Sequence, residues 1–301
     1  MAMMPAGRFA PSPSGELHLG NLRTALLAWL FARSTGRRFL IRIEDLDRAR
    51  AGAEAAQLRD LAAIGIDWDG PVVRQSERTE LYEDALRGLT EDGLTYECYC
   101  TRREIQEAPS APHAPQGAYP GTCRDLSEAE RERRRAERPA AIRLRAGVAE
   151  WAVTDLVHGR YLGLVDDFVL RRNDGVVAYN LAVVVDDAAQ GVDQVVRGDD
   201  LLPSTPRQAY LAGLLGYTVP EYAHVPLVLN QAHRRLAKRD GAVTLAALAA
   251  EGVSAERVTG LLLASLCLPP SLPAALEAFS PAALPRDPWV VDPAGAVRSA
   301  W

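Results

Sequence analysis

The strongest structural signal in the chain is the stretch GRFAPSPSGELHLGN, residues 7–21. A short strand is expected at Gly7 to Ala10, followed by a turn over residues 11–15, which are rich in proline, serine and glycine. A helix is expected from about His18 to Arg33, because leucines recur there at helical spacing. A helix N-terminus exposes unpaired amides and a partial positive charge, so this turn predicts a phosphate-binding site.

The elements outside this stretch alternate between strands and helices. Strands are expected at residues 38–43, 141–145, 168–170, 176–179 after a turn at 173–175, 194–197 and 225–229, the last of them; helices are expected at residues 53–64, 77–91, 127–138, 181–190 and 206–215. This order favours an α/β fold with a doubly wound parallel sheet. The turn at 11–15 would then lie at the carboxyl end of a strand, where such sheets bind ligands.

Composition limits the class of protein. The net charge of −5 argues against a uniformly basic nucleic-acid binder, although arginines could still cluster on one face. The N-terminus lacks the apolar stretch of a signal peptide, and no run approaches the roughly 18 apolar residues of a membrane span. We therefore expect a cytoplasmic protein without a membrane segment. Its length favours one large α/β unit with an insertion, or two domains.

The chain has a single lysine, Lys238, among 34 basic residues, so the other 33 are arginines. It lies in RLAKR, residues 235–239. Lysine is a compact point charge on a flexible stem, whereas arginine presents a wide planar fork. A lysine that persists in so arginine-rich a chain indicates a second phosphate-handling site.

Together these two motifs resemble those of the class I aminoacyl-tRNA synthetases of the glutamyl type. Residues 18–21, HLGN, are similar to the His-Ile-Gly-His element of that family, and residues 235–239 to its Lys-Met-Ser-Lys-Ser loop. The resemblance covers about Arg8 to Gly241 and implies a Rossmann-like domain that activates an amino acid with ATP. Ala237 replaces a serine of the family pattern, which bears on the activation rate.

The resemblance also implies a set of site residues. Catalysis is expected to involve His18 and Lys238, and ATP, together with Mg²⁺, is expected to be bound by His18, Gly20, Asn21, Arg235 and Lys238. Glutamate would contact Arg8, Phe9, Ala10, Pro11, Ser12, Glu44, Tyr179 and Arg197. The chemistry agrees, because Glu44 can bind an ammonium while Arg8 and Arg197 can bind carboxylates bidentately.

Two of these residues have plain structural alternatives. Glu44 could simply pair with Arg42 or Arg48. Arg197 could form a salt bridge with one of the two aspartates at positions 199–200. The strongly charged helix expected at residues 127–138 favours a solvated face over an RNA contact, because its arginines alternate with glutamates.

Three of the four cysteines, Cys98, Cys100 and Cys123, lie within 26 residues of one another. In a reducing compartment such a cluster favours a metal over a disulfide, with free thiols as the alternative. A structural zinc needs a fourth ligand. His113 is the usual chemical choice, whereas the resemblance points to Tyr119. The remaining cysteine, Cys267, lies in an apolar run and is expected to be buried.

The expected architecture is a Rossmann-like doubly wound sheet with a zinc-containing insertion and a short helical C-terminal region. We expect residues 1–97 and 141–241 to form the two halves of the catalytic domain, 98–140 the insertion and 242–301 the C-terminal region. Full-length glutamyl enzymes carry a large anticodon-binding region after the lysine motif, and the 62 residues after Arg239 cannot form one.

Shortened members of the family fit this length and the cysteine pattern. They attach glutamate to queuosine in the anticodon of tRNA(Asp), so glutamate, ATP and that tRNA are the expected partners of a monomeric enzyme. One alternative is a truncated synthetase that charges the 3′ end of a tRNA. The other is a paralogue that binds RNA or amino acid without catalysis, which Ala237 motivates.

Overall fold

The computed structural model describes residues 4–47, 49–107, 119–236 and 244–291. Its strands are β1 (Ala6–Phe9), β2 (Arg38–Ile43), β3 (Val73–Arg74), β4 (Thr95–Cys98), β5 (Ala141–Leu144), β6 (Glu150–Asp155), β7 (Gly159–Leu164), β8 (Val169–Arg171), β9 (Val192–Gly198), β10 (Glu221–Val225), β11 (Val228–Leu229) and β12 (Trp289–Val290). Its helices are α1 (Leu19–Ser34), α2 (Ala53–Ala63), α3 (Thr79–Glu91), α4 (Arg102–Glu107), α5 (Glu128–Glu137), α6 (Tyr179–Gln190), α7 (Thr205–Leu214), α8 (Leu245–Ala250), α9 (Ala255–Ala264) and α10 (Leu272–Ala278), with short 3₁₀ turns at Gln75–Glu77, Asp199–Ser204 and Pro281–Ala283.

The central sheet of the described chain has seven strands in the order β3-β2-β1-β9-β10-β6-β7. Among them, every neighbouring pair is parallel except β6 and β7, which form an antiparallel hairpin. From β1 the chain builds outward through β2 and β3 on one side, and later through β9 and β10 on the other. The strand order therefore reverses between β1 and β9, which is where such sheets bind ligands.

Strand β2 shows that both faces of this sheet are covered. Phe39 and Ile41 are buried in the core that contains the leucines of α1. Leu40, between them, is buried in a separate core with Ala209 of α7. Because side chains alternate between the faces of a strand, this pattern confirms the doubly wound sheet predicted from the sequence.

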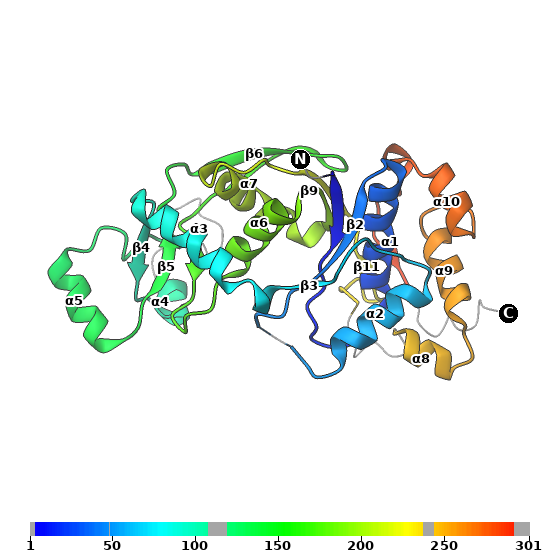
Figure 1. Ribbon diagram of the computed structural model, residues 1–301, viewed down its shortest axis with the longest axis horizontal. Coiled ribbons are helices and arrows are strands. Elements are labelled where there is room, and N and C mark those ends of the chain that lie inside the picture. The colour runs from blue at the N-terminus through cyan, green and yellow to red at the C-terminus, as the bar shows by residue number, and fades with distance from the viewer. Residues whose placement is uncertain (1–3, 48, 108–118, 237–243, 292–301) are drawn as a thin grey trace.

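The small sheet β4-β5-β8 lies at one end of the molecule together with α5 (Figure 1). Its pairs are antiparallel. Helix α5 begins at a Ser127 cap, and none of its residues is buried, as expected for a solvated charged helix. Strands β5 and β8 come from residues that we assigned to the second catalytic half, so the division of the chain into domains stays a prediction.

The C-terminal helices α8 to α10 lie at the opposite end of the molecule, beside α1 (Figure 1). Leu248, Leu262 and Ala275 are fully buried in the same core as the leucines of α1. Strand β12 pairs in parallel with β11, just before the arginine–lysine motif. The described part of the C-terminal region therefore packs as a layer on the same hydrophobic core as α1.

The segment after the turn at residues 173–175 differs from the prediction. The turn is present, because Gly175 has a φ of 87° and its amide donates to the carbonyl of Arg172 at 3.0 Å. The strand expected at 176–179 is wrong: Val177 forms a single bridge, and helix α6 begins at Tyr179. Because α6 begins at Tyr179, its hydroxyl faces Arg197, whose Nη1 lies 3.4 Å away.

The strand expected at residues 225–229 is in fact two. Strand β10 ends at Val225, and the carbonyl of Pro226 accepts a hydrogen bond at 2.8 Å from the buried Arg23 instead of continuing the sheet. Strand β11 then starts at Val228 and pairs with β12. The prediction that no strand follows residue 229 was therefore also wrong.

Two more findings depart from the sequence analysis. Cys267 is exposed, because it follows α9 with a φ of 58° and lies where the chain turns away from the core. The β6–β7 hairpin was not predicted, since within β6 the buried residues are Val153 and Asp155 and the others face solvent. No helix in the described ranges is both long and apolar enough to cross a membrane.

Candidate active site

A pocket of about 440 Å³ opens where the strand order of the central sheet reverses. It is lined by the segments that follow β1, β2, β9 and β10 at their carboxyl ends. The lining contains every described residue that the sequence assigned to glutamate or ATP: Arg8, Phe9, Ala10, Pro11, Ser12, His18, Gly20, Asn21, Glu44, Tyr179, Arg197 and Arg235. Ala237 and Lys238 lie outside the described residues.

One wall of the pocket is the N-terminus of α1. His18 caps this helix: its Nδ1 accepts the amide of Asn21 at 3.2 Å, and the Asn21 side chain accepts the amide of His18 at 3.2 Å. Gly20 is needed beside the ring, because a Cβ there would lie 2.9 Å from Cε1 of His18. His18, Gly20 and Asn21 of this capped N-terminus line the pocket, and a helix N-terminus is a suitable place for a phosphate.

The loop between β1 and α1 is held from α2 by Gln57, a residue that the sequence analysis missed. Its Nε2 donates to the carbonyls of Ser12 and Gly15 at 3.0 and 2.6 Å. The amide of Glu44 donates to the carbonyl of Pro11 at 3.0 Å. A lone glutamine in a helix carries no sequence signal, so only the fold reveals this role.

A buried charge network forms the second wall. Arg42 is fully buried and donates to Asp187 at 2.7 Å and to Glu44 at 3.3 Å. Arg8 reaches the same Asp187 oxygen at 3.3 Å. Burial raises the pKa of Glu44, and Arg42 and Arg8 oppose that rise. Glu44 therefore pairs with Arg42, which was the structural alternative to ligand binding, and it also lines the pocket.

Asp187 forms ion pairs with the same two arginines. Burial alone would raise the pKa of this carboxyl, but Arg8 and Arg42 hold it below its ordinary value. Neighbouring Asp186 accepts hydrogen bonds from Arg78 at 2.6 Å and from Gln75 at 2.8 Å. This side of the pocket is therefore an ion-pair network whose charges are matched within the protein.

The third wall holds Arg197, which is 5% exposed. Its Nε donates to Nε2 of His224 at 3.0 Å, its Nη2 to the hydroxyl of Thr205 at 2.9 Å and its Nη1 to the hydroxyl of Tyr179 at 3.4 Å. The salt bridge with the aspartates at 199–200 that we weighed is not formed, since Asp200 pairs instead with Arg235.

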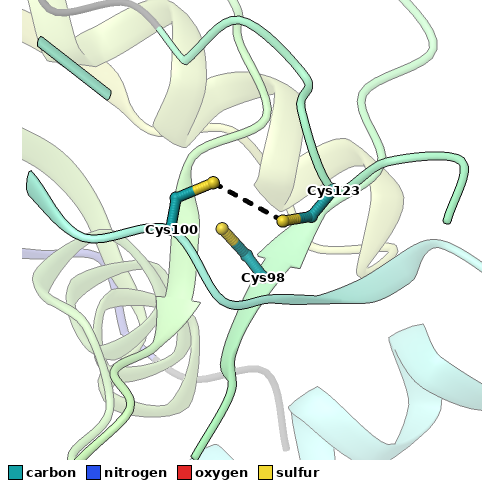
Figure 2. Close-up of side chains that lie close together, drawn as sticks. All are labelled: Cys98, Cys100 and Cys123. Carbon is teal, nitrogen blue, oxygen red and sulfur yellow. Dashed lines mark hydrogen bonds between the residues drawn. The ribbon is translucent and has the colours of Figure 1, made fainter. Parts of the chain in front are cut away.

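The cysteines form a separate site, in the small sheet. The three sulfur atoms lie within 4.8 Å of one another, and Cys100 and Cys123 are 3.5 Å apart (Figure 2). The hydroxyl of Tyr119 is 3.3 Å from the sulfur of Cys98 and 3.5 Å from that of Cys100. Hydrogen bonds from Cys100 and Cys123 hold the pKa of the Cys98 thiol below its ordinary value.

This donor set suits zinc. Three soft sulfur ligands and one oxygen meet around a single centre, and sulfurs on a tetrahedral zinc would be roughly 3.8 Å apart. Arg143, which the sequence analysis did not single out, stacks 3.7 Å above the ring of Tyr119 and helps to hold it. His113, the other candidate for the fourth ligand, lies outside the described residues.

Comparison with known proteins agrees with this geometry. The family model for the catalytic domain of class I tRNA synthetases (E and Q) matches residues 6–265. A glutamyl-Q tRNA(Asp) synthetase of Nocardia farcinica is 69% identical over 97% of this chain and 95% of its own length. One of Cutibacterium acnes is 57% identical over 88% of this chain and 76% of its own length.

A solved structure is similar over nearly the whole chain. The glutamate tRNA ligase of Elizabethkingia meningosepticum, in complex with its amino acid, has a TM-score of 0.83 at 27% identity. The match covers 99% of this chain and 68% of that one. The capped helix α1 and the pocket where the strand order reverses agree with these matches. The chain therefore belongs to the glutamyl-Q tRNA(Asp) synthetases, within the class I tRNA synthetase family.

Proposed function

We propose that the protein activates glutamate with ATP and transfers the glutamyl group to the queuosine base in the anticodon of tRNA(Asp). The observation that carries this proposal is the pocket at the switch point, in which Glu44 lies among buried arginines beside a helix N-terminus. The name shared by relatives that are 57% to 69% identical to this chain supports the choice of acceptor.

Glutamate fits the charges of the pocket. It carries two carboxylates and one ammonium, for which Arg8, Arg197 and Glu44 are the matching groups. Phe9, Ala10, Pro11, Ser12 and Tyr179 complete the proposed amino-acid site. Glutamine would place a neutral amide where a buried cation needs an anion, so we expect the pocket to reject it.

Activation requires a place for ATP. We propose that the triphosphate binds at the N-terminus of α1, with His18, Gly20, Asn21, Arg235, Lys238 and Mg²⁺ as its partners. A carboxylate oxygen of glutamate attacks the α-phosphorus, the bond to the β-phosphate breaks, and pyrophosphate leaves. Donors and cations around the phosphates stabilise the charge that develops.

The transfer step needs a hydroxyl. In this proposal a hydroxyl of the cyclopentenediol ring of queuosine attacks the carbonyl carbon of the adenylate, and AMP leaves with the bonding electrons. Proteins read unstacked loop bases readily, so an anticodon base can enter the pocket. We further propose that the enzyme is monomeric and cytoplasmic.

The cysteine cluster would hold a structural zinc. We propose Cys98, Cys100, Cys123 and Tyr119 as its ligands. With all four positions filled by the protein, the metal would have no open site for substrate. Its role would be to brace the insertion built around the small sheet.

The proposal can be tested by transfer of labelled glutamate, with ATP, to tRNA(Asp) that carries queuosine and to the same tRNA with guanine at that position. We expect label on the queuosine form alone, and we expect it to survive removal of the 3′-terminal adenosine. Label that leaves with that adenosine would indicate a short conventional synthetase. An absence of label and of glutamate-dependent pyrophosphate exchange would indicate a binding-only paralogue.

A further inference from the structure

Behind Arg197 lies a buried pair of side chains that the proposed chemistry does not use. Asp155, at the end of β6, is 2% exposed, and His224, in β10, is fully buried. Nδ1 of His224 lies 2.6 Å from Oδ2 of Asp155, and Nε2 of the same ring lies 3.0 Å from Nε of Arg197. The pair therefore connects the edge of the parallel sheet to an arginine of the pocket.

The contacts determine which ring nitrogen of His224 carries the proton. Nε2 of His224 also lies 3.0 Å from the hydroxyl of Thr205, which can donate or accept. A guanidinium Nε–H can only donate, so a proton on Nε2 would oppose it, and the contact with Arg197 favours Nε2 as the acceptor. The proton is then on Nδ1, where the carboxylate of Asp155 accepts it. Burial lowers the pKa of His224 against the opposing pull of Asp155, so the ring is neutral at pH 7.

Asp155 is itself held in one orientation. Its Oδ1 accepts the amides of Val157 and His158, both at 2.9 Å, and its Oδ2 accepts the amide of His224 at 3.0 Å. Burial opposes its charge, but the hydrogen bonds from His224 and these amides hold the pKa of Asp155 below its ordinary value. A carboxylate fixed in this way can determine which nitrogen of the histidine ring carries the proton.

The two buried arginines of the pocket differ in what holds them. Arg8 contacts the carboxylate of Asp187, which offsets its charge. Arg197 is held by neutral acceptors, namely the imidazole of His224 and the hydroxyls of Thr205 and Tyr179. Among the described residues no carboxylate forms an ion pair with it. Its position is fixed while its charge stays unmatched.

Arg197 also keeps donors for a ligand. A guanidinium has five N–H groups, and three of them are used by His224, Thr205 and Tyr179. One N–H on each terminal nitrogen makes no hydrogen bond within the part of the chain that the structure describes. Two such donors on a planar fork match the two oxygens of a carboxylate.

We propose that Asp155 and His224 are positioning residues that hold Arg197 as an unneutralised carboxylate receptor and so set the preference for glutamate over glutamine. This proposal rests on the proposed function, because it takes Arg197 as a glutamate-binding residue. A buried cation without an internal counter-ion needs an anionic ligand, whereas a neutral amide leaves it unpaired. An acidic partner directly on Arg197 would remove that requirement.

The decisive variant is Asp155→Asn. The new amide keeps Oδ1 as acceptor for the amides of Val157 and His158 and turns an N–H toward Nδ1 of His224. It also sets an N–H against the backbone amide of His224, which Oδ2 accepts in the wild type, so we expect some loss of stability as well. The proton must then move to Nε2, where it opposes Nε–H of Arg197. We expect the KM for glutamate in tRNA-supported pyrophosphate exchange to rise roughly 10- to 100-fold, the effect of one lost charged hydrogen bond.

Other kinetic constants separate positioning from general damage. We expect kcat at saturating glutamate and the KM for ATP to change less than about threefold, because ground-state binding of one substrate is what is lost. The ratio of kcat/KM for glutamate to that for glutamine should fall. His224→Gln offers a carbonyl oxygen near the position of Nε2. It should therefore raise the KM for glutamate less than Asp155→Asn does.

Asp167→Asn is the matched control. Asp167 is also buried, 6% exposed, and also accepts a backbone amide, that of Ala146 at 2.8 Å. It accepts the hydroxyl of Tyr96 and lies in the small sheet region, away from the pocket. We expect this variant to lose stability without any change in the KM for glutamate.

A spectroscopic test does not depend on catalysis. In the wild-type protein with ¹⁵N-labelled histidine, we expect His224 as the neutral tautomer with its proton on Nδ1, assigned through loss of the signal in His224→Gln. A proton on Nε2, or an imidazolium, would overturn the proposal even if Asp155→Asn fails to fold. A folded Asp155→Asn with unchanged KM and selectivity would overturn it as well. If the wild type shows no glutamate-dependent exchange, the proposed function fails, and the tautomer result still stands.

Discussion

The active-site pocket and the cysteine cluster are held together in opposite ways. In the pocket, the buried Arg42 of β2 donates hydrogen bonds to Asp187 of α6 and to Glu44, which follows β2. In the cluster, the sulfurs and the hydroxyl of Tyr119 face each other around one centre. The pocket is therefore organised by contacts within the protein, whereas the cluster is a group of donors that could hold a metal ion, as we propose.

Arg197→Met should give the largest effect, because it removes the receptor from an otherwise preformed pocket. We expect kcat/KM for glutamate to fall roughly 10³-fold, the cost of leaving a buried carboxylate without its partner. The thermal midpoint should change little, since Arg197 has no internal ion pair to break among the described residues. Initial-rate kinetics and calorimetry measure both.

Arg37→Met is the matched control for that variant. Arg37 pairs with Asp193 at 2.9 Å, at the opposite, amino end of the same sheet. Its removal should leave glutamate kinetics unchanged. A similar loss of activity in both variants would show that the sheet, and not the receptor, was damaged.

Arg42→Met should break the internal charge matching of the pocket. Asp187, Glu44 and Asp186 would lose the cation they share; Asp187 would keep Arg8 and Asp186 would keep Arg78, so three carboxylates would face two cations. We expect the free energy of unfolding to fall by about 3–5 kcal/mol. Chemical denaturation at pH 7 measures it, and an unchanged midpoint would mean that the network does not organise the pocket.

Removal of metal should affect the cluster and spare the pocket. With chelator, or in Cys98→Ser, we expect loss of bound zinc and a thermal midpoint lower by roughly 10 °C. Metal content and calorimetry provide the readouts. Cys267→Ser is the control, because Cys267 is exposed and remote from the cluster in sequence. A zinc content that is the same in both variants would contradict the assignment of Cys98.

Glu44→Gln should give the smallest change in stability among these variants. Burial raises the pKa of Glu44, so its charge costs stability above its unfolded pKa, and the favourable contribution of the protonated form is lost as the pH rises. We therefore expect the variant to be more stable than wild type at pH 7, with the difference shrinking toward pH 4, and to lose activity. A thermal midpoint that is lower at pH 7 would contradict this sign.

Much of the pocket could be predicted from the sequence, because its motifs are local. The turn at residues 11–15, the capped helix and the strand ending at Glu44 are each a short run with its own pattern. The resemblance then identified the lining residues, all of which the described structure brings to one pocket. Lys238 was predicted in the same way and stays a prediction.

Other contributors have no local pattern. Asp155 and His224 are 69 positions apart, and each is an isolated polar residue in a short strand. Gln57 is one glutamine in a helix, and Arg143 one arginine in a strand. The hairpin of β6 and β7 was missed as well, since most of β6 faces solvent and gives little apolar signal.

Residue type and spacing were sufficient for most of the long helices and for the doubly wound sheet, because hydrophobic period and turn residues act over a few positions. The chemistry of the two motifs stays a prediction. Three-dimensional packing was required to match Arg8 with Asp187 and to hold Arg197 with neutral groups. Those partners come from strands and helices distant in sequence, and the charge left unmatched in a pocket depends on which side chains meet there.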